Sequence, residues 1–147
     1  MTAVISDAGY DVMDLAHNHI LDSGLEGAFT TADAFKEVGI DPVGVYENPV
    51  RDKAPLFIKN VNGIKVAILS YAYGLESNLT EKEIANHLSN LDEKRMKVEI
   101  ERAEKEADVT VIMPQMGVEY RLEPTDEQVK LYHKMIDWGA DIIFGGH

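Results

Sequence analysis

The chain contains no cysteine among its 147 residues, which excludes disulfide bonds, thiolate zinc sites and cysteine nucleophiles. Basic residues are also scarce, since 14 Lys and Arg stand against 26 Asp and Glu and the formal net charge is −12. The only short basic clusters contain Arg51 with Lys53, and Lys94 with Arg95. A charge of this sign repels phosphate backbones and anionic lipids, so we expect no nucleic-acid partner, whereas divalent cations would be attracted.

Long apolar runs are absent as well. No stretch approaches the length that spans a bilayer, and the N-terminal residues lack the pattern of a signal peptide, so we expect no membrane segment in this chain. The glycine-rich phosphate loop, GxSxG and HExxH do not occur either. With 45% hydrophobic and 27% charged residues the composition is that of a globular protein, and we expect a single α/β domain over residues 1–147.

Apolar periodicity alternates between strand and helix along the chain. Strands are predicted over residues 11–16, 56–61, 64–71, 108–113 and 141–144, and the longer helices over 25–38, 91–107 and 125–139. The dipeptide Asn62-Gly63 between two apolar runs predicts a β-hairpin with a primed turn. The near-continuous apolar run 108–113 is typical of a mostly parallel sheet that is buried on both faces. The predicted fold class is therefore α/β, a mixed, mostly parallel sheet flanked by helices and containing one β-hairpin.

Side-chain spacing also predicts local helix contacts. Three pairs have the spacing of a capping box, in which a hydroxyl and a Glu or Gln three residues later satisfy backbone groups at a helix start. These pairs are Ser23 with Glu26, Thr80 with Glu83, and Thr125 with Gln128. Two pairs four residues apart predict ion pairs on the solvated face of one helix, namely Glu93 with Lys97 and Glu101 with Lys105.

Polar residues follow three of the predicted strands where each strand ends. Asn18 and His19 follow the first strand, Gln115 follows the strand 108–113, and His147 follows the last. In open α/β sheets ligands bind at the carboxyl ends of strands, so these side chains can converge on one site. Amide oxygens and imidazole nitrogens suit divalent ions such as manganese, iron or zinc.

An alternative interpretation needs no ligand. Asn18 and His19 would then belong to a polar strand-to-helix loop, in which Asp22 and Ser23 only cap the following helix. Two histidines in an HxH spacing do not by themselves distinguish this loop from a metal site.

Three stretches of the sequence resemble one known family. They are DVMDLAHNHILDSG at residues 11–24, the group Gly117 to Tyr120 with Pro124-Thr125 and Gln128, and IDWGADIIFGGH at residues 136–147. Together they are similar to the CapA family of bacterial capsule and poly-gamma-glutamate synthesis proteins. The similarity runs in register from Asp11 to the last residue and includes NGIKVAIL at residues 62–69.

This resemblance implies a partial calcineurin-like metallophosphoesterase core, an α/β/β/α sandwich with a two-metal site on strand-end loops. It implies that Asn18 is a metal ligand, that His19 is the catalytic histidine and that His147 is a metal ligand. Gln115 stands where many relatives have a histidine, so an amide replaces an imidazole ligand there. The implied cofactors are two divalent metal ions that would activate a water and bind a phosphoryl oxygen, while His19 assists charge or proton transfer.

The family pattern extends beyond both ends of this chain, with a metal-binding aspartate before it and a second histidine after it. The resemblance therefore implies a central fragment of a longer CapA-like protein, inactive alone, and a role in synthesis or export of the polymer at the cell surface. The implied partners are the anionic polymer and other proteins of the synthesis complex. Two alternatives stay open: a non-catalytic polymer-binding or assembly protein with a degenerate metal site, as Gln115 indicates, and a flavodoxin-like domain.

Overall fold

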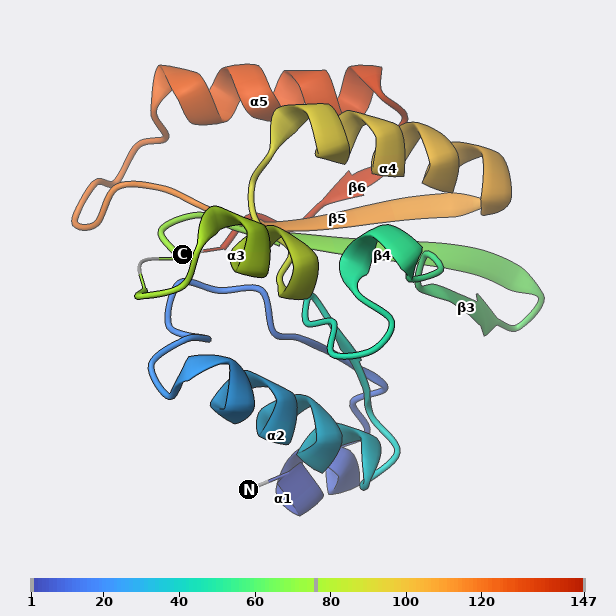
Figure 1. Ribbon diagram of the computed structural model, residues 1–147. Helices are drawn as coiled ribbons and strands as arrows, with labels where there is room; N and C mark the ends of the chain where they lie inside the picture. The colour runs from blue at the N-terminus through green and yellow to red at the C-terminus, as the bar shows by residue number, and fades with distance from the viewer. Residues whose placement is uncertain (1, 76, 147) are drawn as a thin grey trace.

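The computed structural model describes residues 2–75 and 77–146 (Figure 1). Its helices are α1 (Thr2–Asp7), α2 (Gly24–Lys36), the short 3-10 helix η1 (Arg51–Lys53), α3 (Glu81–His87), α4 (Glu93–Glu106) and α5 (Asp126–Asp137). Its strands are β1 (Val12–Asp14), β2 (Asp41–Val43), β3 (Ile58–Val61), β4 (Ile64–Ala72), β5 (Val109–Gln115) and β6 (Ile142–Ile143). Within these described ranges no helix has the length and apolar character of a membrane span.

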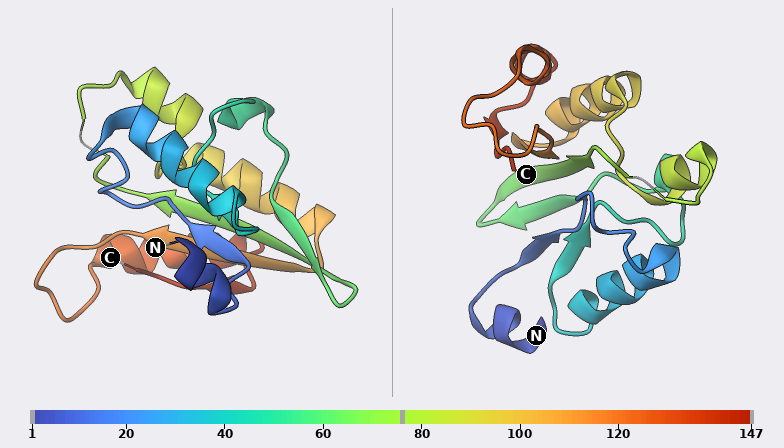
Figure 2. Two further views of the ribbon diagram at one scale, coloured as in Figure 1. Left: turned by 90° about the horizontal axis from the view of Figure 1, so that it is seen from below. Right: turned by 90° about the vertical axis from the view of Figure 1, so that its left-hand side faces the viewer.

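Two sheets lie between two layers of helices. The smaller sheet pairs β1 with β2 in parallel, and the larger has the order β3-β4-β5-β6, in which only β3 with β4 is antiparallel. Helices α4 and α5 cover the larger sheet, and α2 covers the smaller one (Figures 1 and 2). The predicted α/β class, with a mixed, mostly parallel sheet, flanking helices and an α/β/β/α arrangement, is confirmed.

Each helical layer buries its own apolar cluster. Met96 and Ile100 of α4 are fully buried against Tyr71 of β4 and Ile112 of β5. On the other side the buried face of α2 packs on the residues around β1 and β2, with Ala28, Ala32, Phe35, Leu15 and Ile40 among its members. Burying a side chain the size of Met or Ile contributes about 1.5–3 kcal/mol, so these clusters hold each helix layer on its sheet.

The hairpin between β3 and β4 has the predicted two-residue turn. Asn62 and Gly63 both lie in the left-handed region, with φ of 53° and 93°. A primed turn needs positive φ at both central residues, which Asn and Gly adopt most readily. The Asn60 side chain also accepts a hydrogen bond from Gly63 N at 2.9 Å. This part of the prediction is confirmed.

Two of the three predicted capping boxes are present. The Thr80 and Thr125 boxes both have the reciprocal side-chain and backbone hydrogen bonds. The box predicted for Ser23 is wrong, because the Ser23 side chain makes no cap hydrogen bond. An N-cap residue needs an extended backbone to aim its hydroxyl at the helix. Ser23 has φ −109° and ψ 20° instead and continues a series of turns into α2.

Gly44 lets the two sheets approach each other directly after β2. Its φ is +96°, and a Cβ at this position would lie 2.7 Å from both the Ala16 Cβ and the Ser70 Oγ. Only glycine avoids these contacts while keeping the left-handed backbone. The loop after β1 and the C-terminal half of β4 are therefore held against each other at the strand ends.

Candidate functional site at the strand ends

Asn18 and Gln115 meet although they are 97 residues apart in the sequence. Gln115 is the last residue of β5, and Asn18 lies in the turns after β1. The Asn18 backbone N donates to Gln115 Oε1 at 2.9 Å, and Gln115 Nε2 donates to Asn18 Oδ1 at 2.8 Å. The structure thus brings together two residues that the sequence analysis assigned to one strand-end site, and both are partly buried there.

His19, the predicted catalytic histidine, lies one residue further on an exposed turn. Its Nδ1 lies 3.1 and 3.2 Å from the two carboxylate oxygens of Asp22, and its backbone N donates to His17 Nδ1 at 3.1 Å. A carboxylate only accepts hydrogen bonds, so Nδ1 carries the proton and Nε2 is left for other partners. Asp22, which the sequence analysis gave only a capping role, therefore orients the His19 ring.

The third strand end also reaches this region. Gly146 forms a parallel bridge with Gln115, its backbone N donates to Pro114 O at 3.0 Å, and its O accepts from Met116 N at 2.9 Å. The predicted ligand His147 follows directly but lies outside the described residues. The backbone before His147 is thus placed beside Gln115, and the assignment of His147 as a ligand stays a prediction.

The described residues near the strand ends include groups of the kinds that bind metal ions. Asn18 Oδ1 and Gln115 Oε1 are neutral oxygens of a kind that binds divalent ions, and the His19 imidazole lies one residue from Asn18. However, both oxygens already accept a hydrogen bond, Asn18 Oδ1 from Gln115 Nε2 and Gln115 Oε1 from the Asn18 backbone N. Within residues 2–75 and 77–146 no group of three His, Cys, Asp or Glu side chains is arranged to hold a metal ion. The donor set on its own therefore does not complete a metal site.

Asp14 is a further unusual group near the site, and the sequence analysis did not single it out. It is the last residue of β1, and its carboxyl accepts a hydrogen bond from Ala16 N at 2.8 Å. Burial raises the pKa of Asp14 to about 6, although the Ala16 amide and the nearby Ser70 hydroxyl oppose part of this shift. A carboxyl with such a pKa exchanges protons near neutral pH. The sequence signal for it is an acidic residue between the apolar residues Met13 and Leu15 of the predicted strand.

Comparison with known proteins agrees with the resemblance found in the sequence. Residues 1–147 match the family described as bacterial capsule synthesis protein PGA_cap. The chain is 36% identical to the capsule biosynthesis protein CapA of Bacillus anthracis over 97% of its own length, and 31% identical to the PGA biosynthesis protein CapA of Bacillus subtilis over 98%. It spans 36% and 38% of the length of these two relatives.

The fold is similar to that of a solved enzyme structure, the NAD nucleotidase NadN of Haemophilus influenzae. The TM-score is 0.56 at 15% identity, and the similarity covers 99% of this chain and 25% of that one. At this identity the likeness concerns the fold alone, and it is consistent with the calcineurin-like metallophosphoesterase core expected from the sequence. The match over residues 1–147 shows that this chain belongs to the family of bacterial capsule synthesis proteins, and both CapA relatives agree with it.

Proposed function

We propose that this chain forms part of a metal-dependent, metallophosphoesterase-like hydrolase site in a protein that synthesises or exports a capsular polymer at the cell surface. The observation that carries the proposal is the contact between Asn18 and Gln115 at the ends of strands far apart in sequence, beside the backbone that leads to His147. Strand ends of this kind are where α/β folds place their ligands.

Each side chain has a defined part in this proposal. Asn18 Oδ1 and Gln115 Oε1 would hold a divalent cation together with His147 and with groups of the longer protein. The bound cation would supply Lewis-acid chemistry and a more acidic bound water. His19 would exchange a proton with the substrate or leaving group through Nε2, because the Asp22 carboxylate holds its Nδ1.

The proposed partners follow from the family and from the charge of the chain. The relatives are named for capsule and PGA biosynthesis, so we propose an anionic polymer, poly-gamma-glutamate, and other proteins of the synthesis complex as partners. A chain with net charge −12 repels such a polymer unless cations lie between them. Divalent ions would therefore serve both the site and the contact with the polymer.

Metal analysis and a hydrolysis assay on the full-length protein test the proposal. With manganese present, the protein should hydrolyse bis-p-nitrophenyl phosphate, and His19→Ala should lower kcat by about 10²- to 10⁴-fold, the usual contribution of a general acid or base. His133→Ala is the matched control, since His133 is exposed on α5 and has no part in the site. Absence of bound metal and of turnover in the full-length protein would reject the hydrolase.

A second candidate function is non-catalytic polymer binding or assembly with a degenerate metal site. It is favoured by the two hydrogen bonds between Asn18 and Gln115, one from the Asn18 backbone N and one from Gln115 Nε2, because together they occupy both side-chain oxygens. The variant Gln115→His separates the two functions, because an imidazole restores a ligand type that binds transition metals well. In a hydrolase this variant should bind manganese or zinc more tightly than the unmodified protein. In an assembly protein both forms should lack metal and activity, yet still bind the polymer.

A further inference from the structure

Gln128, in the first turn of α5, uses both ends of its side-chain amide. Its Oε1 accepts a hydrogen bond from Thr125 N at 2.8 Å, which is one half of the capping box, and its Nε2 donates to the Met116 carbonyl at 3.1 Å. A backbone N–H only donates and a carbonyl only accepts, so these two partners fix which end of the amide is which. Gln128 therefore joins the start of α5 to the residue directly after β5.

The backbone of Met116 is held on both sides. Its N donates to Gly146 O at 2.9 Å, and its O accepts the hydrogen bond from Gln128 Nε2. The residue before Met116 is Gln115, whose side chain makes the two hydrogen bonds with Asn18. The bond from Gln128 is thus only one residue away from the side chain that contacts Asn18.

The loop that follows Met116 contributes little to holding this strand end. Between β5 and α5 the chain projects from the body of the molecule (Figures 1 and 2), and Val118, Tyr120 and Leu122 are 54%, 101% and 100% exposed. Side chains that are exposed to this degree bury little apolar surface and stabilise the backbone position only weakly. The position of the strand end therefore depends on hydrogen bonds at the base of the loop, to which Gln128 adds one from α5.

The same face of α5 also reaches the end of β6. Tyr132 lies four residues after Gln128, and residues at this spacing lie on the same side of a helix. A Cβ at Gly145 would overlap the Tyr132 hydroxyl and lie 3.1 Å from the ring carbon that bears it, so glycine lets the ring lie directly against the backbone. Gly145 precedes Gly146, which pairs with Gln115. One helix is thus placed against the ends of both β5 and β6.

We infer that Gln128 is a positioning residue of the strand-end site, which holds the end of β5 so that the Gln115 side chain meets Asn18. It acts through the Met116 backbone and needs no contact with a metal or a substrate. Its value for metal binding rests on the proposed function, whereas its hold on the strand end does not. Groups that bind a metal or a substrate must keep their places closely, so loss of the Gln128 contact should loosen the site.

Three substitutions separate this role from helix capping. Thr125→Ala and Gln128→Met each remove one hydrogen bond of the capping box, since Thr125 Oγ accepts from Gln128 N and Gln128 Oε1 accepts from Thr125 N. Only Gln128→Met also loses the hydrogen bond to the Met116 carbonyl. Gln128→Glu keeps both cap hydrogen bonds, because glutamate is a usual capping-box partner, but it cannot donate to Met116.

Hydrogen exchange of the full-length protein, followed by mass spectrometry with a chelator present, tests the inference without metal or activity. In Gln128→Met and Gln128→Glu the backbone amides of Met116 and Asn18 should exchange about three- to tenfold faster, as the loss of one net hydrogen bond predicts. Thr125→Ala is the matched control and should leave both exchange rates as they are. Unchanged rates in the two Gln128 variants, or an equal increase in Thr125→Ala, would overturn the inference.

Manganese binding connects this position to the proposed function. If the full-length protein binds manganese, Gln128→Met, which changes no charge, should weaken manganese binding about three- to tenfold, and Thr125→Ala should not. Unchanged manganese affinity in Gln128→Met would overturn the role of Gln128 in the site. A full-length protein that binds no metal would reject the hydrolase instead, and the exchange rates would still decide whether Gln128 holds the strand end.

Discussion

At the scale of single residues, Asp14 shows how strongly position alters the chemistry of a side chain. Its neighbours on β1 are Val12 and Met13, and the loop after β1 passes close to Gly44 and Ser70. Burial there disfavours the charged carboxylate more than the hydrogen bond from Ala16 N stabilises it, so the pKa rises to about 6. Ionising Asp14 therefore opposes folding.

The substitution Asp14→Asn removes the carboxyl whose ionisation opposes folding, so the stability that it adds should depend on pH. The unfolded carboxyl loses its proton near pH 3.8 and the folded one near pH 6, so the free energy of unfolding falls as pH rises between these values. The free energy of unfolding falls by at most about 3 kcal/mol in total, and the fall is complete above about pH 7. Denaturant unfolding should show no added stability of Asp14→Asn below about pH 4 and a growing advantage above it. Asp137→Asn, at an exposed position, is the control. If the free energies of unfolding of Asp14→Asn and of the unmodified protein differed by the same amount at every pH, this account would be contradicted.

At the scale of elements, helix ends follow local sequence while helix surfaces respond to their neighbours. The Thr80 and Thr125 boxes form as their spacing predicts. On α4, however, Glu93 pairs with Lys134 of α5 at 2.6 Å and not with Lys97, which lies 3.6 Å from Glu101. The two helices lie side by side on the same sheet, so a residue of α5 is available to Glu93 (Figure 1).

The residues before α5 and α2 allow a comparison of two similar substitutions, one with a cap hydrogen bond and one without. Thr125→Ala removes a hydroxyl that accepts a hydrogen bond from Gln128 N, and should lower the free energy of unfolding by about 1 kcal/mol. Ser23→Ala should cost much less, because the Ser23 side chain makes no cap hydrogen bond. Denaturant unfolding of the two variants gives the comparison. Equal costs for both substitutions would show that the cap geometry does not determine the difference.

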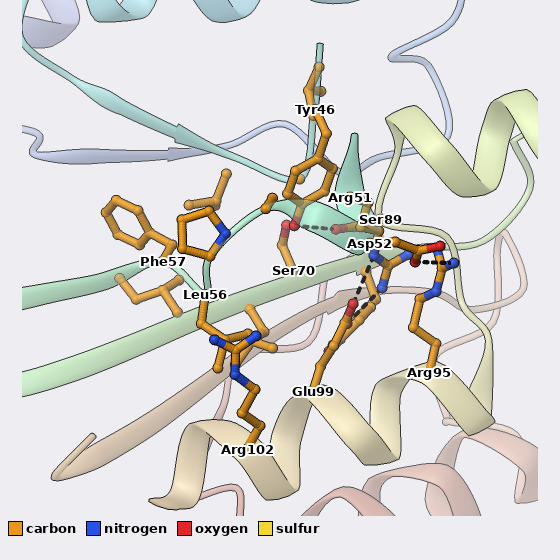
Figure 3. A pocket seen from close by; sticks show the side chains of 18 of the residues that line it. Tyr46, Arg51, Asp52, Leu56, Phe57, Ser70, Ser89, Arg95, Glu99 and Arg102 are labelled. Carbon is orange, nitrogen blue, oxygen red and sulfur yellow. Dashed lines mark hydrogen bonds and ion pairs between the residues drawn. The ribbon is translucent and has the colours of Figure 1, made fainter. Parts of the chain in front are cut away.

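At the scale of the whole molecule, Arg51 joins segments that are distant in sequence. Its side chain is 1% exposed and donates to both Glu99 oxygens of α4, at 3.0 and 2.7 Å. It also donates to the Leu88 carbonyl and to Asn90, and it lies over the ring of Tyr71, whose hydroxyl donates to the same Glu99. In the sequence Arg51 belongs to a short basic cluster, but in the structure it forms a buried ion pair with Glu99 that holds distant segments together (Figure 3).

Removing this arginine should therefore destabilise the fold as a whole. Arg51→Met leaves Glu99 partly buried without its cation, and the free energy of unfolding should fall by about 3–5 kcal/mol. Arg102→Met, which breaks the exposed pair with Glu106, should cost no more than about 0.5 kcal/mol. Thermal or denaturant unfolding of both variants measures the contrast. A small effect of Arg51→Met would mean that the buried network contributes little to stability.

The sequence by itself determined the features that depend on neighbouring residues. Asn62-Gly63 specified the hairpin because few residues other than Asn and Gly readily adopt positive φ, and apolar spacing placed α2, α4 and β5 correctly because one face of each must be buried. Strand-end position also predicted that Asn18 and Gln115 lie close together, and they do, although β1 and β5 belong to different sheets and only the packing of the two sheets brings these strand ends side by side.

Only the tertiary structure decided which distant groups meet and how deeply they are buried. The mutual hydrogen bonds of Asn18 and Gln115, the raised pKa of Asp14 and the pairing of Arg51 with Glu99 all depend on segments packed together across the fold. Desolvation and long-range hydrogen bonds depend on the whole surroundings of an atom, and local sequence patterns do not contain that information.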